Sequence, residues 1–446
     1  MKTRTLLLSV AGLLLAVPLW GQSQRLSLDS SDGRVVWELI PRAEVADSGS
    51  VVSTVGYRLP NAVKGVVPGV VFTAYVQAGK EKNPDVGDNI YKVDERFYSR
   101  PFWYRTEFRL PAALRQGQHV WLHFDNTNRF ADFYFNGHKI SGTATSVKDV
   151  SGHMMRSRFD VTAYVRRDGP NALAVLIYDA DQKKTRTDKG PYGVACSPSY
   201  LAAAGWDWMP YVPGRLAGIT GHAEVTVTGG AVLDDPWMRT ALPTNDRAEL
   251  QLLSAVRNVS AEARDITVSG TVMPGNIHFS KTLRVEAGAT GRVSIGKDDL
   301  AEMVIRNPRL WWPNGYGDPN LYTCKLECRA DGELSDSTTL HFGIRRYDYR
   351  TEINAVGYPV LTLYVNGQRV FVKGGNWGMS EYLLRCHGAE YEPKIRLHKE
   401  MNYNMIRLWT GCVTDDEFYD YCDRYGIMQS WYFTKCGQLP IFVSSL

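Results

Sequence analysis

The chain has little that marks a specialised class of protein. Its net charge is only +4, from 51 basic and 47 acidic residues in a total of 446. A balanced charge with interspersed signs gives no reason to expect a nucleic acid or another acidic partner. The densest basic stretch, KKTRTDKG at 183–190, is flanked by glycine and proline. We expect a solvated loop there.

Cysteine is scarce and odd in number, with seven residues scattered along the chain, which is too few for a disulfide scaffold. Cys324 and Cys328 lie on one predicted strand. A spacing of four residues on a strand is about 13 Å, too far for a disulfide. A Cys-x3-Cys pair without a second pair or histidine partners is also a poor zinc site. We therefore expect buried free thiols.

Long hydrophobic runs are missing except near the N-terminus. There Lys2 and Arg4 precede an apolar run from Leu6 to Val17, followed by a proline and a small residue, Gly21. This order is typical of a secretory signal peptide, and the run is too short to span a bilayer. No cysteine follows it, so a lipid anchor is not expected. We predict a signal peptide at residues 1–22, a secreted or periplasmic protein, and no membrane partner.

Several catalytic signatures are also absent. The sequence has no G-x-S-x-G elbow, P-loop, dinucleotide fingerprint or histidine pair at metal spacing. We therefore expect neither a cofactor nor a metal ion.

The chain has the composition of a folded soluble protein, with 44% hydrophobic, 22% charged and 11% aromatic residues. Its length suggests about three domains.

Period-two alternation dominates the first of these regions. The stretch HVWLHFDN directs Val120, Leu122 and Phe124 to one face of a strand. The stretch NALAVLIYD is apolar enough to be a strand that is covered on both faces. ADFYFNGHKI contains Asn136-Gly137, a strong hairpin signal. With one short helix in VPGVVFTAYVQAGK, residues 23–230 are predicted to form a jelly-roll β-sandwich.

A second all-β region follows at residues 231–345. The segments AELQLLSAVRNVS, ARDITVSGTVM, KTLRVEAGAT and LYTCKLECRA are predicted strands about a dozen residues apart. This spacing is typical of an immunoglobulin-like sandwich.

Residues 346–446 change to alternating strands and helices, which predicts a parallel sheet. A hairpin turns at Asn366-Gly367, and its second arm is expected to continue into the strand VFVKG. A helix in EYEPKIRLHKEMN, a buried strand in YNMIRLW and a helix in TDDEFYDYCDRYG follow, the last with Thr414 as N-cap and Gly426 as stop. A third strand is expected to start at GIM, and strand character to end at about Gln429.

Three pairs of polar and aromatic residues are candidate sugar contacts, because sugars offer an apolar face and many hydroxyls. Asp207 and Trp208 lie in GWDWMPY, which equally fits an aromatic core with a turn. Asn376 and Trp377 follow the first strand of the third region, and Arg407 and Trp409 end the next strand. Ligand sites in such sheets lie at the carboxyl ends of the strands, although each pair could instead be structural. The acidic residues of TDDE are better explained as complements of a helix dipole than as catalysts.

The chain resembles glycoside hydrolase family 2, in particular its β-mannosidase and exo-β-glucosaminidase branch. The resemblance is carried, in order along the chain, by the stretches VPG, PFWYRTEF, ADFYFNG, GWDWMP…PGRLAGI, RLWWPNGYGDPNLY, FGIRR, LYVNGQRVFVKGGNW and NMIRLW…DDEFYDYCDRYGIM. It implies a jelly-roll sugar-binding domain, an immunoglobulin-like domain and a (β/α)8 TIM barrel. It also implies that Asp207, Trp208, Asn376, Trp377, Arg407 and Trp409 contact the substrate.

The resemblance further implies a retaining glycosidase with two catalytic glutamates. In the family these glutamates follow later barrel strands, so we expect them beyond residue 446 and expect an incomplete barrel at 346–446. The segment QSWYFTKCGQLPIFVSSL departs abruptly from the family pattern, which suggests a frameshift or premature stop.

The expected function by family is therefore an exo-acting hydrolase of terminal β-linked sugars, of β-mannoside or β-glucosaminide type, with an oligosaccharide or glycoside as partner. This chain alone is expected to be inactive. The alternatives are a non-catalytic carbohydrate-binding protein that uses the jelly roll, and a structural spacer that binds no sugar.

Overall fold

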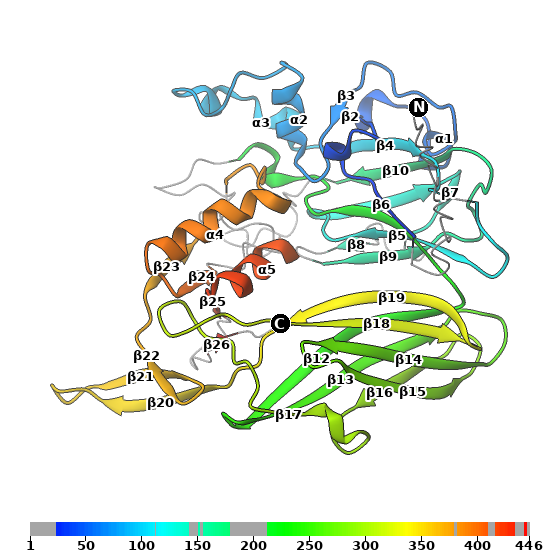
Figure 1. Ribbon diagram of the computed structural model, residues 1–446. Helices are drawn as coiled ribbons and strands as arrows, with labels where there is room; N and C mark the ends of the chain where they lie inside the picture. The colour runs from blue at the N-terminus through cyan, green and yellow to red at the C-terminus, as the bar shows by residue number, and fades with distance from the viewer. Residues whose placement is uncertain are drawn as a thin grey trace, which may run out of the picture.

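The computed structural model describes residues 24–111, 113–141, 150–151, 155–178, 212–378, 381–408, 415–432 and 441–443. Figure 1 shows two β-sandwiches, one above the other, and a small unit of strands and helices (orange to red) that lies beside both. Within the described part of the chain, no helix has the length and apolar character needed to cross a bilayer.

The first sandwich consists of two antiparallel sheets. One sheet has the order β1-β11-β5-β9, and the other has the order β3-β2-β4-β10-β6-β7 with β8 paired to β6. The strands are β1 Gln24–Ser27, β2 Trp37–Pro41, β3 Val63–Gly65, β4 Phe102–Phe108, β5 His119–Phe124, β6 Phe130–Phe135, β7 His138–Lys139, β8 Val150–Ser151, β9 Ser157–Asp160, β10 Asn171–Ile177 and β11 Ala223–Thr228.

The period-two pattern of the sequence correctly predicts which side chains fill this sandwich. Val120, Leu122 and Phe124 are buried in its core, and the ring of Phe124 lies 4.7 Å from that of Phe133 in the opposite sheet. Every residue of β10 is buried, as expected for a strand covered on both faces.

Short helices lie on the rims of the first sandwich: α1 Gly49–Val52, α2 Val71–Gln77 and α3 Glu95–Tyr98, with 3-10 turns η1 Ser30–Asp32, η2 Arg42–Glu44, η3 Asn89–Lys92 and η7 Pro213–Leu216. Helix α2 confirms the helix predicted from VPGVVFTAYVQAGK. The hairpin between β6 and β7 turns at Asn136 and Gly137, with φ of 47° and 91°, as Asn-Gly in a two-residue hairpin turn requires.

The second sandwich packs two four-stranded sheets, in which β17 joins β12-β13-β16 on one side and β15-β14-β18-β19 forms the other. Its elements are β12 Ala231–Thr244, β13 Arg247–Asn258, β14 Arg264–Met273, β15 Ile277–Val285, β16 Thr290–Ile295, η8 Ala301–Met303, β17 Val304–Arg306, β18 Tyr322–Ala330 and β19 Glu333–Phe342. Cys324 and Cys328 are both buried free thiols on β18, as predicted. Burial raises the pKa of each to about 12, so both are unreactive.

A separate three-stranded antiparallel sheet comes next, with β20 Tyr347–Ile353, β21 Pro359–Val365 and β22 Gln368–Val370. The predicted turn at Asn366 and Gly367 is present, with φ of 51° and 82°. The predicted continuation into VFVKG is wrong, because β22 ends at Val370 and the next strand starts at Gly374. Residues 371–373 separate the two strands, and Phe371 among them is 76% exposed, so this stretch lacks the burial that its apolar residues suggest.

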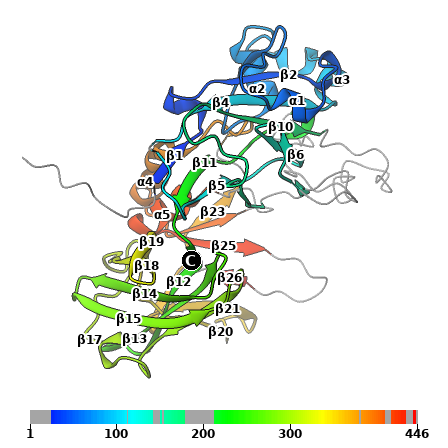
Figure 2. The same ribbon diagram turned by 90° about the vertical axis from the view of Figure 1, so that its right-hand side faces the viewer.

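The last unit is a parallel sheet covered by helices on one face. Strands β23 Gly374–Trp377, β24 Met405–Leu408 and β25 Met428–Tyr432 are parallel, and β26 Ile441–Val443 pairs antiparallel with β25. Helices α4 Tyr391–Glu400 and α5 Asp416–Tyr425, with η9 Gly388–Glu390 before α4, form the covering layer, which Figure 2 shows from the side. The buried residues Ile395, Ile406 and Phe418 belong to the core between sheet and helices.

Two details of this unit correct the sequence prediction. The N-cap of α5 is Asp415, not Thr414, while Gly426 does end the helix, with φ of 73°. Strand character does not end at Gln429, because Gln429 and Ser430 continue β25 in register with Ile406 and Arg407 of β24. Backbone pairing to a neighbouring strand thus extends β25 beyond the part of its sequence that resembles a strand.

Candidate functional site at the carboxyl ends of the parallel strands

Asn376 and Arg407 meet at the carboxyl ends of β23 and β24. They are direct register partners, and Arg407 Nη1 donates a hydrogen bond of 2.8 Å to Asn376 Oδ1. Adjacent parallel strands place equivalent residues side by side at the same sheet edge, which is why two residues 31 apart in sequence can form one polar group. This pairing joins two of the predicted sugar contacts.

The Asn376–Arg407 pair lines a cleft of about 830 Å³, and Ser430 of β25 lines it from the next strand. Tyr316 from the second sandwich and apolar residues of β21 and β22 form the opposite wall. A cleft of this size accommodates a small-molecule ligand. Its mixture of hydrogen-bonding and apolar groups suits a sugar ring.

Trp377 faces away from this cleft. Successive residues on a strand point to opposite faces, so Trp377 enters the helix-covered core and is only 8% exposed. Its ring lies 5.2 Å from Phe418 and 5.5 Å from His398. The geometry therefore favours the structural alternative for this residue. The other predicted contacts, Asp207, Trp208 and Trp409, lie outside the described residues.

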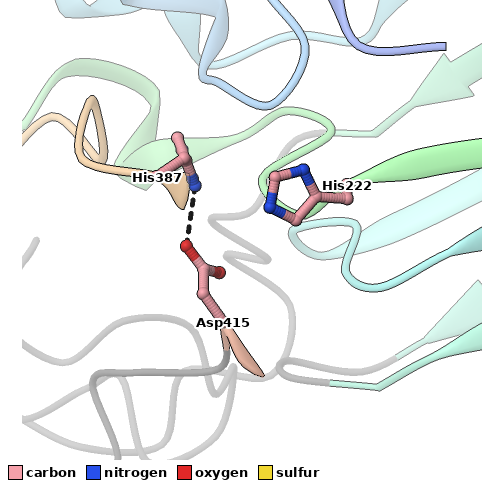
Figure 3. A group of neighbouring side chains, drawn as sticks. All are labelled: His222, His387 and Asp415. Atoms are coloured by element: carbon pink, nitrogen blue, oxygen red, sulfur yellow. Dashed lines mark hydrogen bonds and ion pairs between the residues drawn. The ribbon is translucent and has the colours of Figure 1, made fainter. Parts of the chain in front are cut away.

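A second polar group lies where the first sandwich meets the helices of the parallel unit. Figure 3 shows His222, which precedes β11, facing His387 from the segment after β23 and Asp415 at the start of α5. His387 Nδ1 is 2.8 Å from Asp415 Oδ2, and the two imidazole rings are 5.8 Å apart. The sequence patterns did not single out either histidine, because no local spacing links residues on separate structural units. We refer to His222, His387, Asp415 and the adjacent Glu417 as the junction cluster.

Carboxylates surround His222 on both sides. Its Nδ1 lies 2.6 Å from Asp29 Oδ2 and its Nε2 lies 3.1 Å from Glu417 Oε1. Hydrogen bonding to Asp29 and then to Glu417 outweighs burial and raises the pKa of His222 to about 11. Burial opposes ionisation of Glu417, but its bond to His222 lowers the pKa of this carboxyl overall.

Further ion pairs connect the same two units. Arg156 Nη2 lies 2.6 Å from Asp416 Oδ1 on α5, and Arg385 Nη1 lies 3.1 Å from Asp85 Oδ2 of the first sandwich. The Tyr382 hydroxyl also donates to Asp85, at 2.6 Å. The first sandwich therefore docks on the parallel unit through polar contacts with α5 and with the segment before α4.

Comparison with known proteins identifies relatives of the chain. Residues 46–221 match the "Glycosyl hydrolase 2 galactose-binding domain-like" family model, and residues 231–345 match the "Glycosyl hydrolases family 2" model. The exo-β-D-glucosaminidase of Streptomyces avermitilis is 31% identical over 389 residues, covering 86% of this chain and 40% of the relative. The mannosylglycoprotein endo-β-mannosidase of Lilium longiflorum is 30% identical over 402 residues, covering 86% and 41%.

The structure is also similar to solved structures. The crystal structure of the exo-chitosanase of Amycolatopsis orientalis superposes with a TM-score of 0.76 and 25% identity, covering 93% of this chain and 44% of that one. The β-D-mannosidase of Dictyoglomus thermophilum gives a TM-score of 0.68 at 23% identity, with 92% and 47% covered, which supports a common fold. The chain thus spans less than half the length of the relatives that it matches.

Proposed function

Because this chain belongs to glycoside hydrolase family 2, in the branch of exo-β-glucosaminidases and β-mannosidases, we propose that the protein is an exo-acting, retaining β-glycosidase. Its substrates are glycosides with a terminal β-linked sugar, of mannoside or glucosaminide type. The observation that carries the proposal is the Asn376–Arg407 pair at the rim of the cleft. An amide and a guanidinium held at the carboxyl ends of adjacent strands suit the recognition of sugar hydroxyls.

The proposed roles of the residues follow from the mechanism of retaining glycosidases. One carboxylic acid protonates the departing oxygen and a second carboxylate attacks the anomeric carbon, from about 5 Å away. Asn376 and Arg407 would orient the terminal sugar for these two groups, together with Asp207, Trp208 and Trp409. The proposed catalytic glutamates belong to later barrel strands than β23, β24 and β25, so the 446 residues alone are not expected to hydrolyse a glycoside.

The proposed organisation is a signal peptide at 1–22, a jelly roll at 23–230, an immunoglobulin-like sandwich at 231–345 and the beginning of a TIM barrel at 346–446. It is supported by the two antiparallel sandwiches, the parallel strands with covering helices, and the two matched family models. Secretion or export to the periplasm is proposed on the basis of the N-terminal sequence alone.

The test has two parts, using the purified 446-residue chain. Aryl β-mannosides and aryl β-glucosaminides should give no release of aglycone above a blank preparation, and clear turnover would contradict the proposal of inactivity. Isothermal titration with mannose, glucosamine and galactose should show weak binding of one of the first two. Absence of all binding would count against a sugar site built from Asn376 and Arg407.

The second candidate is a non-catalytic carbohydrate-binding protein. It is favoured by the match of residues 46–221 to a galactose-binding domain-like model. This candidate predicts sugar affinity that is lost on Asp207→Ala and unchanged by Arg407→Ala, whereas a site at the parallel strands predicts loss with Arg407→Ala.

A further inference from the structure

The junction cluster brings metal-ligand side chains together from three distant segments. His222, His387 and Asp415 each offer one ligand atom, and these atoms all lie within 4.8 Å of one another. In Figure 3 the ring of His222 faces the gap between itself and the His387–Asp415 pair. Two imidazole nitrogens and a carboxylate oxygen form a ligand set that zinc prefers, whereas magnesium and calcium prefer oxygen alone.

Each histidine has its other ring nitrogen fixed by a hydrogen-bond acceptor. His222 Nδ1 donates to Asp29 Oδ2 at 2.6 Å, and Asp29 Oδ1 is itself held by the backbone N–H of Ala223 at 3.0 Å. His387 Nε2 lies 2.8 Å from the Leu384 carbonyl. Because a carbonyl can only accept, Nε2 of His387 must carry its hydrogen. Both histidines are thereby oriented to present the remaining nitrogen to the gap, as ligating histidines do.

Two buried atoms beside the gap are incompletely satisfied. Among the described residues, Glu417 Oε2 has no hydrogen-bond partner, and His222 Nε2 has only its ion-pair contact with the other oxygen of Glu417. Glu417 Oε1 lies only 3.1 Å from His222 Nε2, so this carboxylate is within reach as a fourth ligand. Buried polar atoms without partners are costly, and a bound cation would satisfy both.

We propose that His222 Nε2, His387 Nδ1, Asp415 and Glu417 form a binding site for a zinc-type divalent cation. The cation would occupy the gap between His222 and the His387–Asp415 pair. Its role is structural: the ligands come from the first sandwich, from the segment before α4 and from the start of α5. Binding therefore fastens the first sandwich to the parallel unit.

The test uses the full chain after removal of metal with a chelator. Zinc chloride should bind with one ion per chain by calorimetry and elemental analysis, and should raise the midpoint of thermal unfolding, while magnesium chloride should not. Cobalt(II) should give visible ligand-field bands of four-coordinate geometry, without the near-ultraviolet charge-transfer band of thiolate ligands.

Variants separate this site from other sources of zinc binding. His387→Gln and His222→Gln should each abolish stoichiometric binding, and Asp29→Asn should weaken it by about 10- to 100-fold, because Asp29 only orients His222. His278→Gln, on the exposed surface of β15, is the matched control and should bind zinc like the wild type.

If a histidine variant fails to fold, the zinc affinity of Asp29→Asn and the cobalt spectrum of the wild type still decide whether the site exists. Octahedral cobalt, thiolate ligation or zinc binding that survives both histidine substitutions would overturn the proposal.

Discussion

Arg407 on β24 donates a hydrogen bond to Asn376 on β23, so the first two parallel strands are joined at their carboxyl ends by side chains as well as by backbone. The bond fixes both groups toward the cleft, whereas their neighbour Trp377 is buried on the other face of the sheet. The alternation of one strand thus places Asn376 in the cleft and Trp377 in the core.

Removal of the guanidinium should weaken sugar binding with little effect on stability. Arg407→Ala is expected to lower affinity for the preferred monosaccharide by about 10-fold, because a charged hydrogen bond contributes roughly 1.5 kcal/mol or more. Arg239→Ala, at an exposed position of β12, should leave affinity unchanged. Calorimetric titration checks both, and equal affinities would remove Arg407 from the site.

Gly374 should tolerate no side chain, although the adjacent Gly375 should. A Cβ on Gly374 would lie 1.8 Å from the Met405 carbonyl oxygen, while a Cβ on Gly375 meets nothing within 4 Å. Gly374→Ala must push β23 away from β24 and is expected to cost roughly 2 kcal/mol or more of unfolding free energy. Gly375→Ala should be near neutral. Denaturant unfolding of the two variants gives the comparison, and similar stabilities would contradict the close approach of these strands.

Arg345 should be essential for docking α5 on the second sandwich. Its side chain is 4% exposed, lies 3.3 Å from Asp423 and stacks 4.4 Å above the ring of Trp311. Burial is the main cause that raises the pKa of Asp423, so loss of Arg345 leaves a poorly solvated carboxyl group. Arg345→Ala is expected to destabilise the protein by on the order of 3 kcal/mol.

The control for this variant is Arg424→Ala, because Arg424 pairs with Asp420 on the surface of the same helix at 2.6 Å, with 52% and 32% of the side chains exposed. Exposed pairs contribute below about 1 kcal/mol. Thermal unfolding should therefore separate the two variants clearly, and a small effect of Arg345→Ala would indicate that α5 does not depend on this contact.

His123 should make stability fall in mild acid. Burial, followed by the charges of Arg158 and Arg25, lowers the pKa of His123 to about 4, against about 6.5 in an unfolded chain. Between these values the unfolded state binds more protons, so the unfolding free energy decreases as pH falls, by roughly 1–2 kcal/mol for this partly exposed group.

The substitution His123→Gln keeps a hydrogen-bonding group near Thr226 Oγ1, which lies 2.7 Å from His123 Nε2, and it removes the titration. Urea unfolding at pH 7 and pH 4.5 should show a smaller loss of stability in this variant than in the wild type. His341→Gln, at an exposed position of β19, should lose as much stability between pH 7 and pH 4.5 as the wild type. If His123→Gln also lost as much stability as the wild type, the acid effect would not come from His123.

Limited proteolysis should leave a stable piece ending near residue 345. Each sandwich has its own buried core, whereas the region beyond carries exposed apolar side chains such as Phe371, at 76%, and Leu361, at 54%. Mass spectrometry of the products would identify the boundary. Cleavage distributed evenly over both sandwiches would contradict independent folding.

Local patterns were sufficient to predict many elements. The Asn-Gly turns at 136–137 and 366–367 are correct because only residues that tolerate positive φ suit a two-residue hairpin. Helix α2, the stop of α5 at Gly426 and the burial of β10 also follow from sequence. The prediction for VFVKG is wrong because this stretch is not buried, and those for Thr414 and Gln429 are wrong because a contact with another element overrides the local signal.

Asp415 illustrates why the N-cap prediction failed. Its carboxylate does not cap α5 but bonds with His387 and with the hydroxyl of Tyr391, at 2.8 and 3.0 Å. The local sequence around Asp415 could not predict this contact, because His387 lies 28 residues away in the sequence.

The sequence by itself determined the family resemblance, the alternation of the two sandwiches and the presence of polar residues at strand ends, because these depend on residue type and short-range spacing. Only the tertiary structure decided that Asn376 and Arg407 share one cleft while Trp377 does not, and that His222 meets His387 and Asp415 across two units. Such groupings depend on register and docking, which are set by the burial of entire sheets and helices rather than by neighbours along the chain.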